Sequence, residues 1–332
     1  MKIGFFELER WEEEYIKKNL KGHKLTFEKS PLSEKNVKKY SNLDVVVCFI
    51  YSEINEKVIG EMKNLKFIAT MSTGFEHIDL KACGKRGIKA ANVPYYGENT
   101  VAEHTFGLIL ALVRHMHKAI DETKEDKFSI KGLIGIDLAG KTLGVIGPGR
   151  IGQHVIKIAN GFEMKVIAYS PHEDKKLAKA LNFKYVSLNE LLKKSDIITI
   201  HAPLNDSTFH MISMKNVKTI KKGAYLINSA RGAIVDTTAL LYALDNGILA
   251  GAGLDVLEGE DNIRDERALL KGEIKRDEME ILIENHALLK ERNVIITPHI
   301  AFYTKEALMR IVDTTLDNIR GFLKKRLRNE VK

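Results

Sequence analysis

Apolar and polar positions along the first hundred residues follow two periods in turn. Short apolar or β-branched runs of strand length alternate with longer stretches of helical character, such as Glu7–Leu20 and Asn55–Met62. Strands that alternate with helices predict a parallel sheet with helices on both faces. The expected strands are Lys2–Phe6, Val45–Ile50, Phe67–Met71 and Ile88–Val93.

The most extended helical pattern in the chain is Asn99–Glu122. Its apolar residues, among them Val101, Phe106 and Leu112, recur at helical spacing, and Gly107 is the one glycine within it. Such periodicity predicts a single long helix. Because the pattern is apolar over much of the circumference, we expect this helix to be buried in a core or in a subunit interface.

A second alternation of strands and helices follows the long helix. It predicts six strands, the number in a doubly wound dinucleotide-binding sheet. A final helix is expected over Lys305–Arg326. The chain of 332 residues is also longer than a typical domain, so two α/β domains are expected. The six expected strands are Thr142–Ile146, Lys165–Tyr169, Asp196–Ile200, Ala224–Ile227, Ala252–Leu254 and Val294–Thr297.

Composition narrows the class of protein. Hydrophobic residues at 44% and charged residues at 29% are typical of a globular protein with a buried core. The net charge of +8 is scattered along the chain, which argues against a nucleic-acid-binding surface. Cys48 and Cys83 offer neither a disulfide framework nor a CxxC metal site, and no apolar stretch is long enough to span a membrane. We therefore expect a cytoplasmic protein without a metal, membrane or nucleic-acid partner.

A glycine-rich turn follows the expected strand Thr142–Ile146. Gly147, Gly149 and Gly152 form a GxGxxG pattern with Arg150 and Ile151 inside it, and a helical stretch, Gln153–Asn160, follows. The first glycine permits a tight turn, the second lets the backbone approach a pyrophosphate, and the third lets helix and strand pack closely. The helix N-terminus then offers N–H groups and a positive dipole to the anion. This context predicts a dinucleotide site.

The position expected to hold the adenosine ribose departs from the usual pattern. An acidic residue commonly ends the next strand, about 20 residues on, where it binds the ribose hydroxyls. Here Ser170 stands in that place, followed by Pro171 and His172. A serine does not repel a 2′-phosphate, and His172, Lys175 or Lys176 could pair with one. The choice between NAD and NADP therefore stays open.

Several motifs in order resemble the D-isomer-specific 2-hydroxyacid dehydrogenases, and most of all their D-lactate dehydrogenase branch. The resemblance covers nearly the whole chain, and the combination of motifs is far more specific than any one of them. The motifs are STGFEHID at 72–79, VPYY at 93–96, VAEHT at 101–105, the glycine turn, NSARG at 228–232, LDVLEGE at 254–260 and TPHIAFYT at 297–304.

The resemblance implies a particular domain arrangement. It implies two doubly wound parallel-sheet domains, with a Rossmann cofactor domain, residues 101–298, inserted into a discontinuous flavodoxin-like substrate domain made of residues 1–100 and 299–332. The helix Asn99–Glu122 would cross between the domains and form the contact of a homodimer.

The resemblance also implies three catalytic residues. Arg231 would bind the substrate carboxylate, His299 would be the acid–base, and Glu260, rather than the competing Glu258, would pair with the histidine. The chemistry independently suits these residue types. Histidine titrates near neutrality, a neighbouring carboxylate stabilises the imidazolium and fixes the ring tautomer, and the arginine fork binds a carboxylate through two parallel hydrogen bonds.

Further positions come from the resemblance. Thr73, Gly74, Tyr96 and Phe302 would bind the substrate. Glu103 and His104 are interpreted as structural, whereas His77, His201 and His210 are left unassigned. Additional cofactor contacts, beyond the glycine turn and Ser170, would be Ala202, Pro203, Thr208, Ala230 and Asp255.

Two departures from the family pattern bear on the identity of the substrate and on the choice between Glu258 and Glu260. Met71 stands where many members of that branch have arginine, and Asp261 replaces a proline that follows the glutamate in the family. The charged segment Asp261–Glu291 looks like the added segment of that branch, expected to be helical and near the mouth of the site.

The sequence thus predicts an enzyme that transfers a hydride between NAD(P)H and a small 2-keto acid to give a D-2-hydroxy acid. Pyruvate comes first among the substrates, and glyoxylate, hydroxypyruvate and branched 2-keto acids are alternatives. From another class, a dinucleotide-sensing corepressor that binds proteins is compatible with the same fold.

Overall fold

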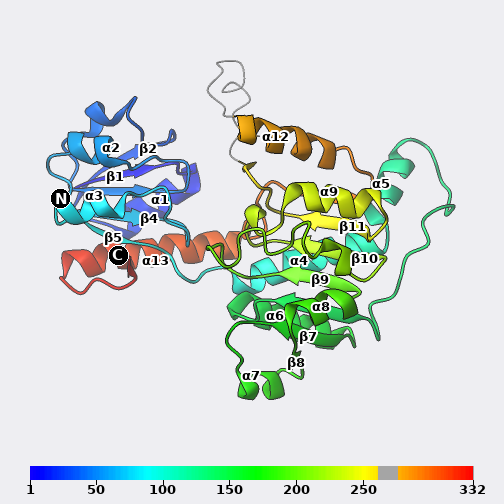
Figure 1. Ribbon diagram of the computed structural model, residues 1–332. Helices are drawn as coiled ribbons and strands as arrows, with labels where there is room; N and C mark the ends of the chain where they lie inside the picture. The colour runs from blue at the N-terminus through cyan, green and yellow to red at the C-terminus, as the bar shows by residue number, and fades with distance from the viewer. Residues whose placement is uncertain (261–275, 332) are drawn as a thin grey trace. The chain divides into compact units, whose positions relative to one another are not determined.

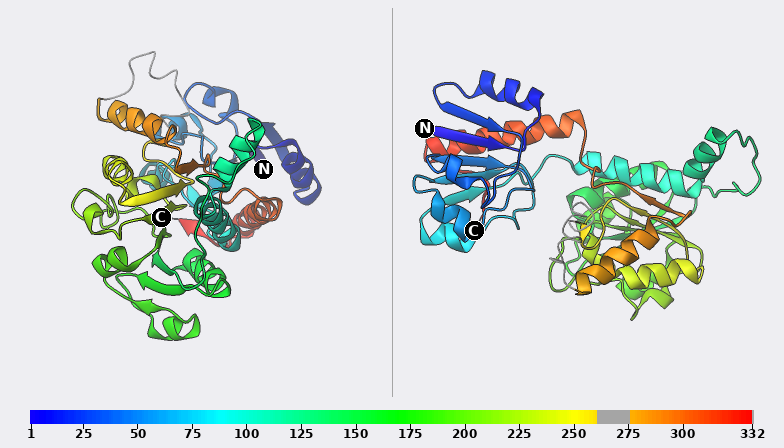
Figure 2. Two further views of the ribbon diagram at one scale, coloured as in Figure 1. Left: turned by 90° about the vertical axis from the view of Figure 1, so that its right-hand side faces the viewer. Right: turned by 90° about the horizontal axis from the view of Figure 1, so that it is seen from above.

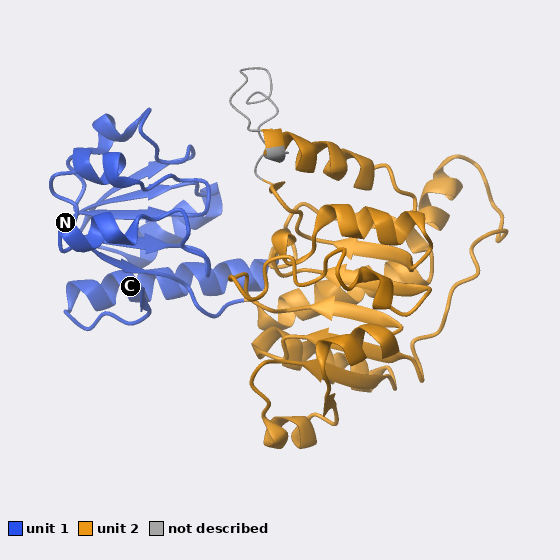
Figure 3. Ribbon diagram, viewed as in Figure 1, with its two compact units in different colours: residues 1–96, 304–332 blue, residues 97–303 orange. Residues whose placement is uncertain are grey.

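The computed structural model describes residues 1–260 and 276–331, and within them the chain divides into two compact units. One unit comprises Met1–Tyr96 and Thr304–Lys332, and the other comprises Gly97–Tyr303 (Figure 3). The chain divides after Tyr96 and after Tyr303, whereas the boundaries expected from the sequence lie after residues 100 and 298. Within the described ranges, no helix is long and apolar enough to cross a membrane.

The first unit is built on a six-stranded sheet with strand order β13-β5-β4-β3-β1-β2. Its first five strands are parallel in the order 2-1-3-4-5, the flavodoxin-like arrangement, and only β13 is antiparallel. The strands are β1 Lys2–Phe6, β2 Lys24–Glu28, β3 Val45–Cys48, β4 Phe67–Thr70, β5 Lys89–Ala91 and β13 Glu330–Val331.

Helices cover this sheet on both sides. One face packs against α2, α3 and the 3-10 turn η1 through a core that includes Val46 and Ile68. The other face meets α13, where the rings of Phe67 and Phe322 stack with centroids 4.5 Å apart. The helical elements are α1 Arg10–Asn19, η1 Val37–Tyr40, α2 Glu56–Glu61, α3 Leu80–Lys85 and α13 Lys305–Leu323.

The second unit is built on a seven-stranded, fully parallel sheet with strand order β12-β11-β10-β9-β6-β7-β8. The order reverses between β6 and β9, as in a doubly wound dinucleotide fold. The strands are β6 Thr142–Ile146, β7 Lys165–Tyr169, β8 Lys184–Tyr185, β9 Ile197–Ile200, β10 Ala224–Asn228, β11 Leu249–Leu254 and β12 Val294–Ile296.

Two separate cores fill the space between this sheet and its helices. α4 and α6 pack on one face, and α8 and α9 on the other, with α12 packed on α9 (Figures 1 and 2). The helical elements are α4 Glu98–Val113, α5 Met116–Lys124, α6 Arg150–Gly161, α7 Lys175–Ala180, α8 Leu188–Lys194, η2 Val217–Thr219, η3 Gly232–Ile234, α9 Thr237–Asp245 and α12 Arg276–Leu288.

The prediction of one continuous helix over Asn99–Glu122 is wrong. The helix ends at Val113, and α5 begins after His115, whose φ of 50° is left-handed. A returning segment explains the break, because the Ile136 N–H donates to the Val113 carbonyl at 3.0 Å, a position that a continuous helix would use internally. The expected burial holds for α4, whereas no residue of α5 is buried.

The charged segment after Glu260 is described only in part. The prediction for residues 261–275 lies outside the described residues, and Arg276–Leu288 forms the helix α12, as the resemblance implies.

Candidate active site

The glycine turn has the geometry that a pyrophosphate requires. Gly147 has a φ of +87°, and a Cβ there would lie 2.9 Å from Ala202 N at the end of β9. A Cβ on Gly152 would lie 2.5 Å from the Gly147 carbonyl, so the helix α6 packs directly on the turn. A Cβ on Gly149 would meet no described atom within 4 Å. The open space at the N-terminus of α6 therefore fits a dinucleotide phosphate.

Arg150 places a positive charge at this turn, whereas the neighbouring His201 is neutral. Arg150 is largely exposed and lies 3.8 Å from Glu98, which stands at the start of α4. Burial lowers the pKa of His201, beside Ala202, to about 3, so this imidazole is neutral at physiological pH. Its Nε2 lies 2.9 Å from Thr199 Oγ1.

Ser170 lies directly after β7, at the position expected for the ribose contact. Its hydroxyl accepts a hydrogen bond from the His172 N–H at 3.2 Å, so it stabilises the turn that leads to α7. His172, Lys175 and Lys176 are all exposed.

His299 stands in a tight loop that winds around the carboxylate of Asp255. The Ile300 and Ala301 N–H groups donate to Asp255 at 2.9 and 2.8 Å, and the Thr297 hydroxyl donates to it at 2.6 Å. Asp255 is only 1% exposed, so its charge is compensated by these donors. His299 itself has a left-handed φ of 55°, a conformation that persists only where the surroundings fix it.

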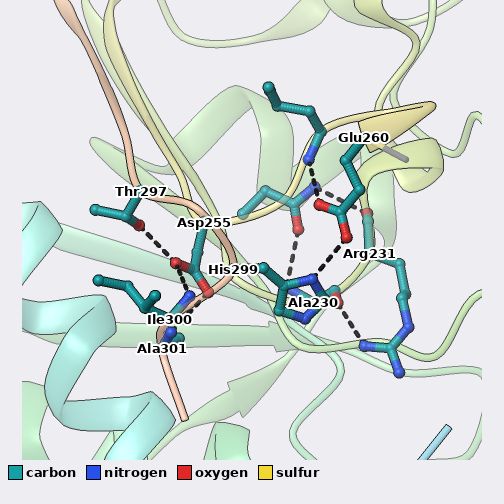
Figure 4. Close-up of polar contacts among 10 residues, drawn as sticks. Ala230, Arg231, Asp255, Glu260, Thr297, His299, Ile300 and Ala301 are labelled. Carbon is teal, nitrogen blue, oxygen red and sulfur yellow. Dashed lines mark hydrogen bonds and ion pairs between the residues drawn. The ribbon is translucent and has the colours of Figure 1, made fainter. Parts of the chain in front are cut away.

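Glu260 and His299 form the central pair of the site (Figure 4). His299 Nδ1 lies 2.6 Å from Glu260 Oε1, and the two side chains are 26% and 25% exposed. The other carboxylate oxygen accepts from the Leu257 N–H at 3.2 Å. With Nδ1 donating to the carboxylate, Nε2 is the ring nitrogen left for a reacting group.

Arg231 belongs to the segment that follows β10, and this segment packs on the turn that carries Glu260. Its carbonyl accepts from Asn228 Nδ2 at 2.9 Å, and its guanidinium donates to the Ala230 carbonyl at 2.8 Å. The next residue, Gly232, packs so tightly on the Leu257–Glu258 peptide that a Cβ would lie 2.0 Å from the Leu257 carbonyl carbon. The structure therefore brings the Arg231 segment directly onto the turn that carries Glu260.

The remaining predicted residues divide between the units. Thr73, Gly74 and Tyr96 belong to the first unit, where Thr73 and Gly74 form a turn after β4: the Thr73 carbonyl accepts from Asn92 and the Gly74 carbonyl accepts from Ser72. Phe302 belongs to the second unit, and its ring meets that of His299 edge-on at 6.4 Å.

Two predicted cofactor contacts have well-defined local roles. Thr208 is 7% exposed, and its hydroxyl donates to the Pro203 carbonyl at 2.6 Å, which closes the loop that follows Ala202. The Ala230 N–H donates to Asn228 at 3.1 Å. Among the described residues, no group of three or more His, Cys, Asp or Glu side chains is arranged to hold a metal ion.

Two histidines near the site were given no functional role from the sequence. His104 of α4, which was interpreted as structural, contacts Thr297 of the His299 loop at 3.1 Å and Asp255 at 3.5 Å. His210 pairs with Glu258 at 2.6 Å. The competition between Glu258 and Glu260 is a signal in the sequence, because two carboxylates within three residues suggest two partners.

Comparisons with known proteins agree with this geometry. The family model for the D-isomer specific 2-hydroxyacid dehydrogenase NAD binding domain matches residues 106–301. D-lactate dehydrogenase of Escherichia coli K12 is 33% identical over 98% of this chain and 97% of its own. An aromatic 2-oxoacid reductase of Clostridium sporogenes is 40% identical over 81% of this chain and 79% of its own.

A solved structure extends the similarity to three dimensions. The D-lactate dehydrogenase of Aquifex aeolicus, solved with NAD and lactic acid, has a TM-score of 0.85 and 36% identity, and the match covers 98% of this chain and 96% of that one. Its agreement with both sheets confirms the predicted fold class. The chain belongs to the D-isomer specific 2-hydroxyacid dehydrogenases, a family of oxidoreductases that act on CH–OH groups.

Proposed function

We propose that this enzyme reduces a small 2-keto acid to the D-2-hydroxy acid, with Arg231, Glu260 and His299 as its catalytic residues. The observation that carries the assignment is the 2.6 Å contact between Glu260 and His299. This contact supports His299 and Glu260 as the acid–base pair, and Nε2 would then be the proton-transferring atom.

Each residue has a defined task in this mechanism. NADH supplies the hydride for C2 of the keto acid when it is bound. His299 Nε2 donates a proton to the carbonyl oxygen as negative charge develops there, and Glu260 stabilises the imidazolium from the other side of the ring. Arg231 binds the substrate carboxylate through guanidinium N–H groups other than the one that it donates to the Ala230 carbonyl.

Other assignments support these three. Asp255 is a positioning residue, because its carboxylate already holds the backbone of the His299 loop. Thr73, Gly74 and Tyr96 are proposed substrate-binding residues on the resemblance, and Phe302 is proposed on the resemblance and on its edge-on contact with the His299 ring.

For the cofactor, the family match supports NAD, and we infer relaxed discrimination against NADP. The glycine turn, with Arg150 and Ile151, would bind the pyrophosphate, and Ala202, Pro203, Thr208 and Ala230 would line the remaining path. Ser170 supports the inference because it places no negative charge beside the ribose 2′ position. His172 and the exposed Lys175 and Lys176 follow it.

Pyruvate is the first substrate to test, because the D-lactate dehydrogenases align over nearly the whole chain. The relative named for aromatic 2-oxoacids and the buried Met71 at the end of β4 justify a wider panel. Oxidation of NADH and of NADPH should be followed at 340 nm with pyruvate, glyoxylate, hydroxypyruvate, and branched and aromatic 2-keto acids. No turnover with any of them would refute the proposed function.

We also propose a homodimer. The sequence assigned the dimer contact to the helix Asn99–Glu122, but most of its first part, α4, is buried in the core of the unit. We therefore propose that the dimer interface is formed by α5 and the segment after it. Met116 and Ile120 of α5 are about half exposed, and Phe128, Ile130 and Ile134 are 95%, 90% and 89% exposed. Large apolar side chains exposed to this extent mark an interaction surface.

Phe128→Glu with Ile130→Glu should give a monomer in light scattering, and an unchanged mass would refute this interface.

A further inference from the structure

A second carboxylate–imidazole pair lies two residues before the catalytic glutamate. Glu258 Oε1 lies 2.6 Å from His210 Nε2. The other oxygen accepts from the Thr237 hydroxyl at 3.0 Å, at the start of α9. Glu258 is only 9% exposed. Both carboxylate oxygens are thus engaged inside the unit, so Glu258 is not available for a reacting group.

The backbone of the same residue is anchored from a third element. Asn285 of α12 is fully buried, and its Nδ2 donates to the Glu258 carbonyl at 2.8 Å. We call His210, Glu258, Thr237 and Asn285 the Glu258 clamp. It joins the loop after β9, the turn after β11, α9 and α12.

The clamp acts on a short turn that has little freedom of its own. Gly259, between the two glutamates, has a φ of +63°, and Glu260 accepts a hydrogen bond from the Leu257 N–H across the same turn. The side chain and carbonyl of Glu258 hold the residue from which this turn starts, and the Leu257 N–H holds the Glu260 carboxylate that contacts His299.

The same clamp reaches the arginine segment. The Leu257–Glu258 peptide is in direct contact with Gly232, the residue after Arg231. The N–H of His210, which has a left-handed φ of 48°, donates to the Ala233 carbonyl at 2.9 Å. His210 and Glu258 therefore contact both sides of the Arg231–Ala233 segment.

We propose that Glu258 and His210 are positioning residues for the reaction. They align Glu260 with His299 and fix the segment of Arg231, without contacting the reactants. This inference rests on the proposed roles of Glu260 and His299. A displacement of about 1 Å in such an alignment can lower turnover by about 10²-fold.

The test compares Glu258→Ala with the near-isosteric Glu258→Gln. Glutamine keeps an oxygen that accepts from the His210 Nε2–H, and its amide N–H can donate to the Thr237 hydroxyl, which then changes from donor to acceptor. Glu258→Gln should therefore keep turnover within about threefold of the wild type. Glu258→Ala should lower kcat by roughly 10- to 100-fold while NADH affinity, measured by fluorescence, is kept. His210→Asn should resemble Glu258→Ala, because asparagine tolerates the left-handed backbone but is too short to reach Glu258.

A second readout does not depend on turnover. The titration of the His299 ring can be followed by NMR, and its signal is assigned by its loss in His299→Ala. The titration midpoint should shift in Glu258→Ala in the same direction as in Glu260→Gln. In Glu258→Gln it should stay at the wild-type position. A folded Glu258→Ala enzyme with wild-type kcat and titration would overturn the proposal, as would a loss of thermal stability and kcat without a change in titration.

The two proposals fail differently. A wild-type enzyme that reduces no 2-keto acid, with the His299 titration still coupled to Glu258, would overturn the proposed function and keep the clamp. An active enzyme in which Glu258→Ala leaves the His299 titration unchanged would overturn the positioning role of Glu258 and keep the proposed function.

Discussion

Replacement of Glu260 by glutamine tests the central pair most directly. The variant keeps the shape of the side chain and an acceptor for the His299 Nδ1–H at its 2.6 Å contact, but removes the negative charge that stabilises the imidazolium. A hydrogen bond to a charged group contributes about 1.5–3 kcal/mol. The pair is about one quarter exposed, so the lower half of this range applies. Reduction should therefore slow by roughly 10- to 40-fold.

The pH dependence gives the sign of the effect. In the direction of hydroxy acid oxidation His299 must be neutral to accept the proton, so activity falls on the acid side of the profile. Loss of the carboxylate disfavours the imidazolium, so the acid limb should move to lower pH in Glu260→Gln. The matched control, Glu258→Gln, should leave the limb in place. An unmoved limb in Glu260→Gln, or a limb moved by Glu258→Gln instead, would refute the assignment and transfer the role to Glu258.

Three further predictions follow from the structure. His299→Ala should lower kcat by at least about 10²-fold with cofactor affinity kept, and near-normal turnover would remove it from the mechanism. The kcat/KM values of the wild type for NADH and NADPH should lie within about two decades, and Ser170→Asp should restore a strong NADH preference; a wild-type preference beyond about a thousandfold would contradict this. Burial raises the pKa of Glu7 above 4.5, so its contribution to stability is present below that value and is lost as pH rises through the raised value. Glu7→Gln should therefore raise Tm more at about pH 8 than at about pH 4, and an equal change at both would count against the burial argument.

The fold could be predicted wherever burial leaves a clear pattern in the sequence. β1 and β6 have the predicted bounds, because four consecutive residues of each are buried and such parallel strands read as continuous apolar runs. The strands missed were edge or terminal ones. β2 has no fully buried residue, and β8 and β13 are two residues long, so none of them carries a strong pattern.

Long-range contacts account for the other differences. Nothing between Asn99 and Glu122 marks a helix end, and the break is set by Gly135 and Ile136, which meet the last carbonyl of α4 from the returning chain. In the same way, His210 and Glu258 are 48 positions apart in the sequence. A motif can indicate that a carboxylate is needed, whereas the choice between two neighbouring carboxylates requires knowledge of which histidine each one faces.

The placement of the three proposed catalytic residues follows from strand order. Arg231, Glu260 and His299 come after β10, β11 and β12, which are adjacent parallel strands of one sheet. The carboxyl ends of parallel strands lie at one edge, where α/β proteins bind their ligands. Precision at that edge comes from side chains that bind backbone: Asp255 holds the His299 loop, and Glu258 holds the Glu260 turn. Both anchors belong to the same unit as the pair that we propose for proton transfer.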